Sequence, residues 1–115
     1  HINNQIELYN LDIRIIPNLE RNELLSYYYK VNALIYPSYF ECFGIPLVEA
    51  MNSDLPVIAS ELDYVRDLID PVEAFDPTSP RSISRAVKRF LDYREERYDV
   101  VSANSFIKSI IAYAK

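Results

Sequence analysis

Two glutamates flank the only glycine of the chain, an arrangement that suits a ligand carrying hydroxyl and phosphate groups. Glu41 precedes Gly44, whereas Glu49 follows it, with Pro46 between them. Carboxylates accept paired hydrogen bonds from neighbouring hydroxyls, such as those of a sugar or a ribose. Proline favours the first positions of a helix, and the unpaired N–H groups of a helix start attract phosphate. The two carboxylates would then contact opposite ends of an extended ligand.

Gly44 is unusual because the rest of the chain contains no glycine, against a usual frequency of about 7%. A sequence that keeps a single glycine needs it at that position. Glycine permits either a close approach of the backbone to a ligand or a positive φ in a turn. The residue types alone leave both explanations open.

The segments around this glycine predict how it is positioned. Residues 33–36 and 55–59 are short apolar runs typical of buried parallel strands. A short helix that begins at Pro46 lies between them, and Asn52 or Asp54 suits the left-handed conformation at its end. Ligands of open α/β sheets bind beyond the carboxyl ends of the strands, where the loop 38–45 falls.

The remaining pattern alternates strands and helices, which predicts right-handed βαβ units and an α/β fold. We expect further strands at 12–16 and, weakly, at 74–75. Ser60 with Asp63 resembles a capping box, and Ser79 with Pro80 marks another helix start. The helices expected besides the one at Pro46 cover residues 20–30, 61–68, 80–91 and 102–113. Three good strands and one weak strand are too few for a complete doubly wound domain, which usually has about five or six. The pattern therefore predicts that the chain is the second half of such a domain.

These residues also carry a family resemblance that covers most of the chain. The sequence resembles the signature of glycosyltransferase family 4, whose members are retaining enzymes of GT-B fold. The resemblance is carried by Tyr36-Pro37-Ser38, Glu41, Phe43-Gly44-Ile45-Pro46, Glu49-Ala50-Met51 and Leu55-Pro56-Val57-Ile58-Ala59-Ser60. The resemblance implies a Rossmann-like parallel sheet with flanking helices, the second half of a GT-B C-terminal domain. Residues 1–115 would form part of a nucleotide-sugar-binding domain, with the acceptor domain outside the chain.

The resemblance implies that the first part of this motif binds the donor sugar. Glu41 matches the motif glutamate that lies beside the sugar and contacts its hydroxyls, which makes it the expected catalytic residue. The backbone of Cys42, Phe43 and Gly44 would bind the same sugar. Cys42 itself is expected to be a small structural residue, because no histidine base accompanies it.

The second part would bind the nucleotide. The N–H groups of Ile45 and Leu47 are expected to face the diphosphate, and Glu49 is expected to bind the ribose hydroxyls. Enzymes of this type use a nucleotide-diphosphate sugar as substrate and need no metal or other cofactor, because the helix terminus and basic side chains stabilise the leaving diphosphate.

Three features depart from the family pattern. Pro17-Asn18 stand where members carry a glycine near the base, and Asp54 replaces another glycine. The basic pair that grips the diphosphate lies upstream in the family, outside this chain. The chain begins with His1 rather than Met, which predicts a longer polypeptide. We therefore expect the isolated chain to be inactive.

Composition restricts the class of partner. The formal net charge is −5, without a run of like charges, which argues against a nucleic-acid partner. Cys42 is the only cysteine, so no internal disulfide forms and a cytoplasmic location fits. No apolar run approaches the ~20 residues of a membrane span. The resemblance leaves peripheral association with the inner face of the membrane open.

Alternative functions follow from what this chain lacks. The expected function is to bind a nucleotide-activated sugar for retaining transfer to a glycan or lipid-linked acceptor, which a missing N-terminal domain would hold. The alternative is a non-catalytic α/β module for oligomerisation or partner binding, consistent with ten tyrosines. A sugar epimerase or phosphorylase of the same fold ranks last, because those families generally lack this glutamate spacing.

Overall fold

The computed structural model describes residues 1–40, 43–92 and 111–112, which include a parallel three-stranded sheet. Its strands lie side by side in chain order, β1 (Leu34–Tyr36), β2 (Val57–Ser60) and β3 (Glu73–Phe75). Leu34 pairs with Val57, and Ala59 pairs with Ala74. This arrangement confirms the predicted α/β class with a parallel sheet.

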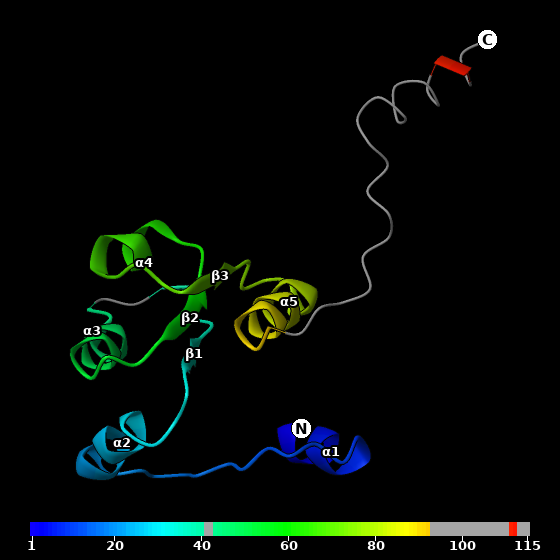
Figure 1. The fold of residues 1–115 in the computed structure, drawn as a ribbon. Coiled ribbons are helices and arrows are strands. Elements are labelled where there is room, and N and C mark those ends of the chain that lie inside the picture. Colours follow the sequence, from blue (N-terminus) through cyan, green and yellow to red (C-terminus); the bar gives the residue numbers. More distant parts are fainter. Residues whose placement is uncertain (41–42, 93–110, 113–115) are drawn as a thin grey trace.

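Helices lie on both sides of this sheet (Figure 1). The described helices are α1 (Ile2–Leu8), α2 (Arg21–Tyr28), α3 (Ile45–Asn52), α4 (Asp63–Leu68) and α5 (Pro80–Phe90). Helix α3 connects β1 to β2, and α4 connects β2 to β3. Both lie on one face of the sheet, whereas α5 lies on the other (Figure 1). Each crossover therefore returns the chain to a neighbouring parallel strand.

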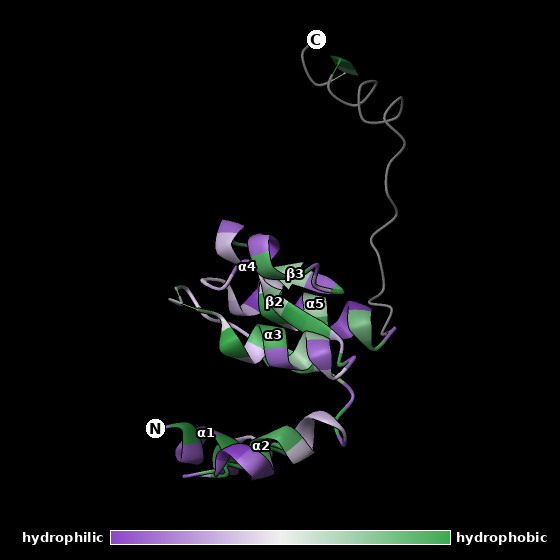
Figure 2. Cartoon of the chain, turned by 90° about the vertical axis from the view of Figure 1, so that its left-hand side faces the viewer, coloured by the Kyte–Doolittle hydropathy of each residue, from purple (hydrophilic) through white to green (hydrophobic). Residues whose placement is uncertain are grey.

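The alternation of side chains along β2 divides the core into two layers. Val57 and Ala59 pack in the cluster formed with α2, α3 and α4, whereas Ile58 packs with Phe75 of β3 and Ala86 of α5. All four residues of β2 are buried, and this apolar strand lies in the middle of the molecule in Figure 2. A central strand covered on both faces explains the uninterrupted apolar run in the sequence.

The prediction of a strand at residues 12–16 is wrong. The segment forms no strand, and Ile13, Ile15 and Ile16 are exposed. The observed order β1-β2-β3 corresponds to strands 4-5-6 of a doubly wound sheet of order 3-2-1-4-5-6. Along the chain, the strand before strand 4 is strand 3, which lies at the opposite edge of such a sheet. A segment in that position, such as residues 12–16, has no partner among the described strands.

Two details of helix starts also differ from prediction. Ser60 does not cap α4, which begins after Leu62 without a side-chain cap. The Ser60 hydroxyl instead donates to the carbonyl of Tyr36 at 3.4 Å, linking β2 to β1. Helix α3 begins one residue earlier than expected, so Pro46 occupies its second position.

The predicted end of α3 and the predicted start of α5 are confirmed, whereas one helix was missed. Asp54 adopts the left-handed conformation after α3, with φ of 53°, and Ser79 caps α5 as expected. Helix α1 was not predicted. It buries none of its residues and lies apart from the sheet in both views (Figures 1 and 2). Most of the helix predicted at 102–113 lies outside the described residues.

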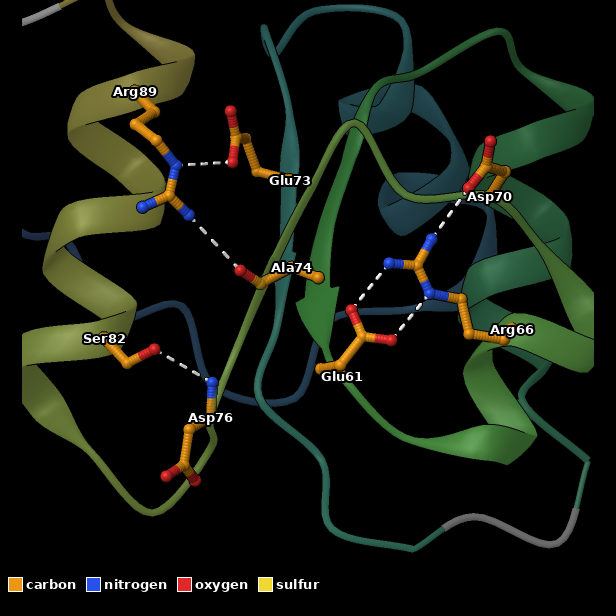
Figure 3. A network of polar contacts seen from close by, with 8 residues as sticks. All are labelled: Glu61, Arg66, Asp70, Glu73, Ala74, Asp76, Ser82 and Arg89. Carbon is orange, nitrogen blue, oxygen red and sulfur yellow. Dashed lines mark hydrogen bonds and ion pairs between the residues drawn. The ribbon is translucent and has the colours of Figure 1, made fainter. Parts of the chain in front are cut away.

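Two arginines, one on α4 and one on α5, form ion pairs with neighbouring segments (Figure 3). Arg66 of α4 donates two hydrogen bonds to Glu61, at 2.8 and 2.6 Å, and one to Asp70 at 2.8 Å. These bonds lower the pKa of the Glu61 carboxyl. Arg89 of α5 donates to Glu73 at 2.8 Å. Across the described ranges, no helix is long and apolar enough to cross a bilayer.

Candidate functional site

Gly44 begins α3 in a conformation that other residues rarely adopt. Its φ is 56°, in the left-handed region, and the residue is buried. A Cβ atom added at Gly44 would collide with the side chain of Leu68 at the end of α4. Of the two explanations left open by the sequence, a positive φ is therefore observed, and close packing against α4 adds a second reason for glycine.

The start of α3 offers a limited set of N–H groups to an anion. Pro46 has none, and the Leu47 N–H already donates to the Gly44 carbonyl at 3.0 Å. The Ile45 N–H has no acceptor among the described residues. A phosphate at this terminus would thus bind Ile45 directly, whereas it would compete with Gly44 for Leu47. The side chain of Leu47 is fully buried and anchors α3 in the core.

The loop that leads into α3 is hydrogen-bonded to α4, which follows β2, and to the loop after β3. The Tyr64 hydroxyl of α4 donates to the Ser38 carbonyl at 3.3 Å. The Tyr39 hydroxyl donates to the carbonyl of Pro77, which follows β3, at 3.3 Å. All three segments therefore meet at the carboxyl edge of the sheet, where open α/β folds bind ligands.

Phe43 lies at this edge with its ring toward solvent. Its exposed fraction is 78%, so the side chain takes no part in the core. This exposure suits the predicted use of its backbone rather than its ring. Glu41 and Cys42, the remaining predicted sugar-binding residues, lie outside the described residues.

Glu49 lies one helical turn after Ile45, about 6 Å along the helix axis, and its carboxylate faces α2. Only 13% of its side chain is exposed, and Arg21 Nη2 approaches Glu49 Oε1 to 2.5 Å. Tyr28, at the other end of α2, also contacts this carboxylate. Burial raises the pKa of the Tyr28 hydroxyl, and the charge of Glu49 and its hydrogen bond with Tyr28 raise that pKa further.

Arg21 and Tyr28 are the parts of the site that the sequence did not predict. One feature of the sequence indicates that Arg21 has a partner outside its own helix. A cation in the first turn of a helix opposes the helix dipole and is unfavourable there. Arg21 is the first residue of α2, so a partner elsewhere explains its position. Tyr28 also packs in the core.

The site brings together a helix terminus and a mostly buried carboxylate, which suit an anion and a hydroxyl pair respectively. Among the residues that the structure covers, no three His, Cys, Asp or Glu side chains gather as a metal site requires. Metal-independent chemistry stays a prediction.

Comparison with known proteins agrees with this geometry. Residues 1–105 match the family described as glycosyl transferases group 1. An O-antigen chain mannosyltransferase of Salmonella typhimurium is 33% identical over 105 residues, which are 82% of this chain and 30% of that protein. A serotype-specific mannosyltransferase of Escherichia coli is 30% identical over 90 residues, covering 77% of this chain and 11% of that protein.

A solved structure shows the same fold. The sucrose-phosphate synthase of Thermosynechococcus elongatus superposes with a TM-score of 0.69 at 28% identity, over 79% of this chain and 24% of that one. The chain thus spans a third or less of each of these proteins. This chain therefore shares its arrangement of strands and helices with an enzyme of known structure.

Proposed function

Because this chain belongs to the glycosyl transferases group 1 family, we propose that it binds the nucleotide-sugar donor of a retaining glycosyltransferase. The observation that carries the proposal is the placement of α3. Gly44 opens this helix at the carboxyl edge of a parallel sheet, and Glu49 follows one turn later with its carboxylate mostly buried. A donor has a diphosphate for the helix start and ribose hydroxyls for the carboxylate.

The chain would form the second half of a GT-B C-terminal domain. The three strands among its described residues have the order expected of that half, and it spans 30% of its Salmonella relative. The first half of the sheet, the acceptor domain and the basic pair that grips the diphosphate would come from other parts of the protein. The non-catalytic module considered above would need none of these.

Within this site each motif residue has a proposed role. Glu41 would contact the donor sugar, together with the backbone of Cys42 and Phe43. The Ile45 N–H would bind the diphosphate, and Glu49 would bind the ribose. The helix terminus and the upstream basic residues would stabilise the leaving group without a metal.

The names of the relatives suggest the substrates. One of them is an O-antigen chain mannosyltransferase, and another is a serotype-specific mannosyltransferase. We therefore propose an activated mannose as the donor and a growing bacterial polysaccharide, glycan or lipid-linked, as the acceptor. A cytoplasmic location with peripheral contact at the membrane belongs to the same proposal, and sedimentation with anionic vesicles would test the contact.

Titration calorimetry of the intact protein with GDP-mannose and UDP-glucose tests the donor site. Glu49→Ala should weaken binding of the preferred donor by about tenfold to a hundredfold, because hydrogen bonds to a charged group are lost. Glu41→Ala should mainly lower turnover. Glu73→Ala is the matched control, because Glu73 begins β3 at the opposite end of the sheet and pairs with Arg89.

Donor affinity that is unchanged in both the Glu41 and Glu49 variants would remove the site assignment. A folded intact protein that binds neither donor would favour the interaction module.

A further inference from the structure

The Glu49 carboxylate has two oxygens in different surroundings. Oε1 is buried, and none of the described residues donates a well-directed hydrogen bond to it. Its charge is matched by Arg21 Nη2 at 2.5 Å. The exposed 13% of the side chain therefore excludes Oε1. Because Oε1 accepts no such bond, the hydrogen bond with Tyr28 falls to Oε2, and a carboxylate oxygen has a second lone pair with which it can accept from a ligand hydroxyl.

A mostly buried carboxylate requires a partner to remain in place. Removal of a charge from water is costly unless the charge is paired. Without Arg21, the Glu49 side chain would gain by turning toward solvent, because its remaining contact on α2 is the neutral Tyr28 hydroxyl. The guanidinium thus fixes a rotamer that water alone would not favour.

The position of Arg21 is unfavourable for α2 itself. A cation at a helix start opposes the helix dipole, and 68% of the Arg21 side chain is exposed, so core packing does not account for it. The ion pair across to α3 is the contact that explains an arginine here.

We propose that Arg21 is a positioning residue of the donor site. Its guanidinium holds Oε1 of Glu49 so that Oε2 is directed at the hydroxyl pair of the donor ribose. This inference rests on the proposed function, since it assigns Glu49 to the nucleoside part of the donor. Arg21 acts through Glu49 and contributes no contact to the reacting atoms.

A purely structural role would instead join α2 to α3. Such a role would change stability without selectively changing nucleotide affinity. The two roles are separated by comparing donor KM with kcat, and by asking whether the effect of Arg21 depends on Glu49.

The test uses the intact protein and measures its affinity for GDP and UDP by titration calorimetry. Arg21→Ala should weaken binding of the preferred nucleoside diphosphate about tenfold. The loss is that of a hydrogen bond between a ribose hydroxyl and the charged Glu49 carboxylate, which Arg21 would no longer hold in place. The donor KM should rise with kcat within about twofold, because the sugar end is untouched. Arg21→Lys should restore part of the affinity, because it keeps the charge without the planar fork.

The double variant Arg21→Ala with Glu49→Ala should bind no more weakly than Glu49→Ala alone. The matched control is Arg81→Ala. Arg81 also lies in the first turn of a helix, α5, and is exposed, and it forms no ion pair within the described ranges. Its replacement should leave affinity unchanged.

Three results would overturn the inference. They are wild-type affinity in Arg21→Ala while Glu49→Ala binds weakly, additive effects in the double variant, or equal losses in Arg21→Ala and Arg81→Ala. Unchanged affinity in Glu49→Ala would instead contradict the proposed function. Thermal unfolding of each variant identifies losses that come from misfolding, and Arg21→Lys then carries the comparison.

Discussion

At the scale of single residues, this site depends on backbone conformation as much as on functional groups. Gly44 and Asp54 bracket α3, and both have a positive φ, of 56° and 53° respectively. Gly44 is buried against Leu68, whereas Asp54 is exposed. The same left-handed conformation is thus adopted by glycine where a side chain would clash and by aspartate where it would not.

Gly44→Ala should therefore destabilise the protein by about 1–2 kcal/mol from the left-handed backbone alone, and by more if Leu68 cannot move. Urea unfolding measures the change. Asp54→Gly is the control. It should raise the free energy of unfolding, because it relieves the strain of a left-handed aspartate at a similar φ. Equal stability of wild type and Gly44→Ala would show that α3 can begin in another conformation.

At the scale of elements, α5 is the helix that local signals define best. Ser79 Oγ accepts a hydrogen bond from the Ser82 N–H at 3.1 Å, and Pro80 occupies the first position. Its apolar side packs through Ala86 and Phe90 against the face of the sheet opposite α3. The helix thus supports the strands that carry the site without contributing to the site.

Ser79→Ala should lower the free energy of unfolding by about 1 kcal/mol, because an N-cap acceptor is lost. Ser84→Ala is the matched control on the same helix, since Ser84 is exposed in its middle and alanine favours helix interiors. Both are measured by denaturant unfolding. A loss in Ser84→Ala as large as in Ser79→Ala would contradict the assignment of the cap.

At the scale of the whole molecule, apolar surface gathers in the part of the chain before α2. Leu11, Ile13, Ile15 and Ile16 are exposed, and so are Ile2 and Leu8 of α1. Such a concentration of exposed apolar residues marks a surface that another segment covers. The proposed first half of the sheet would provide that cover, with the segment at 12–16 as a strand of that half.

Hydrogen exchange tests this proposal by comparing the 115-residue chain with the intact protein. Amides of residues 12–16 should exchange rapidly in the isolated chain, because no described strand pairs with them. They should be protected in the intact protein, where strand pairing would add hydrogen bonds. Amides of β2 provide the control, since this strand is paired on both sides. Rapid exchange at 12–16 in both samples would contradict the proposed division of the sheet.

The sequence by itself determined the features that depend on neighbouring residues. Apolar runs, Ser79 before Pro80, and the single glycine before Pro46 are local signals, and they predicted the parallel α/β order, the cap of α5 and the special backbone at Gly44. The proposed role of Glu49 also comes from the sequence, through the resemblance of its motif to a family signature.

Only the tertiary structure decided which distant groups meet. Ser60 has the spacing of a cap, but its hydroxyl bonds to Tyr36 because β1 lies beside β2. The segment at 12–16 has the composition of a strand but lacks a neighbour to pair with. Arg21 pairs with Glu49 because the fold brings α2 against α3. Such partners depend on how the elements pack, and no local pattern in the sequence encodes that packing.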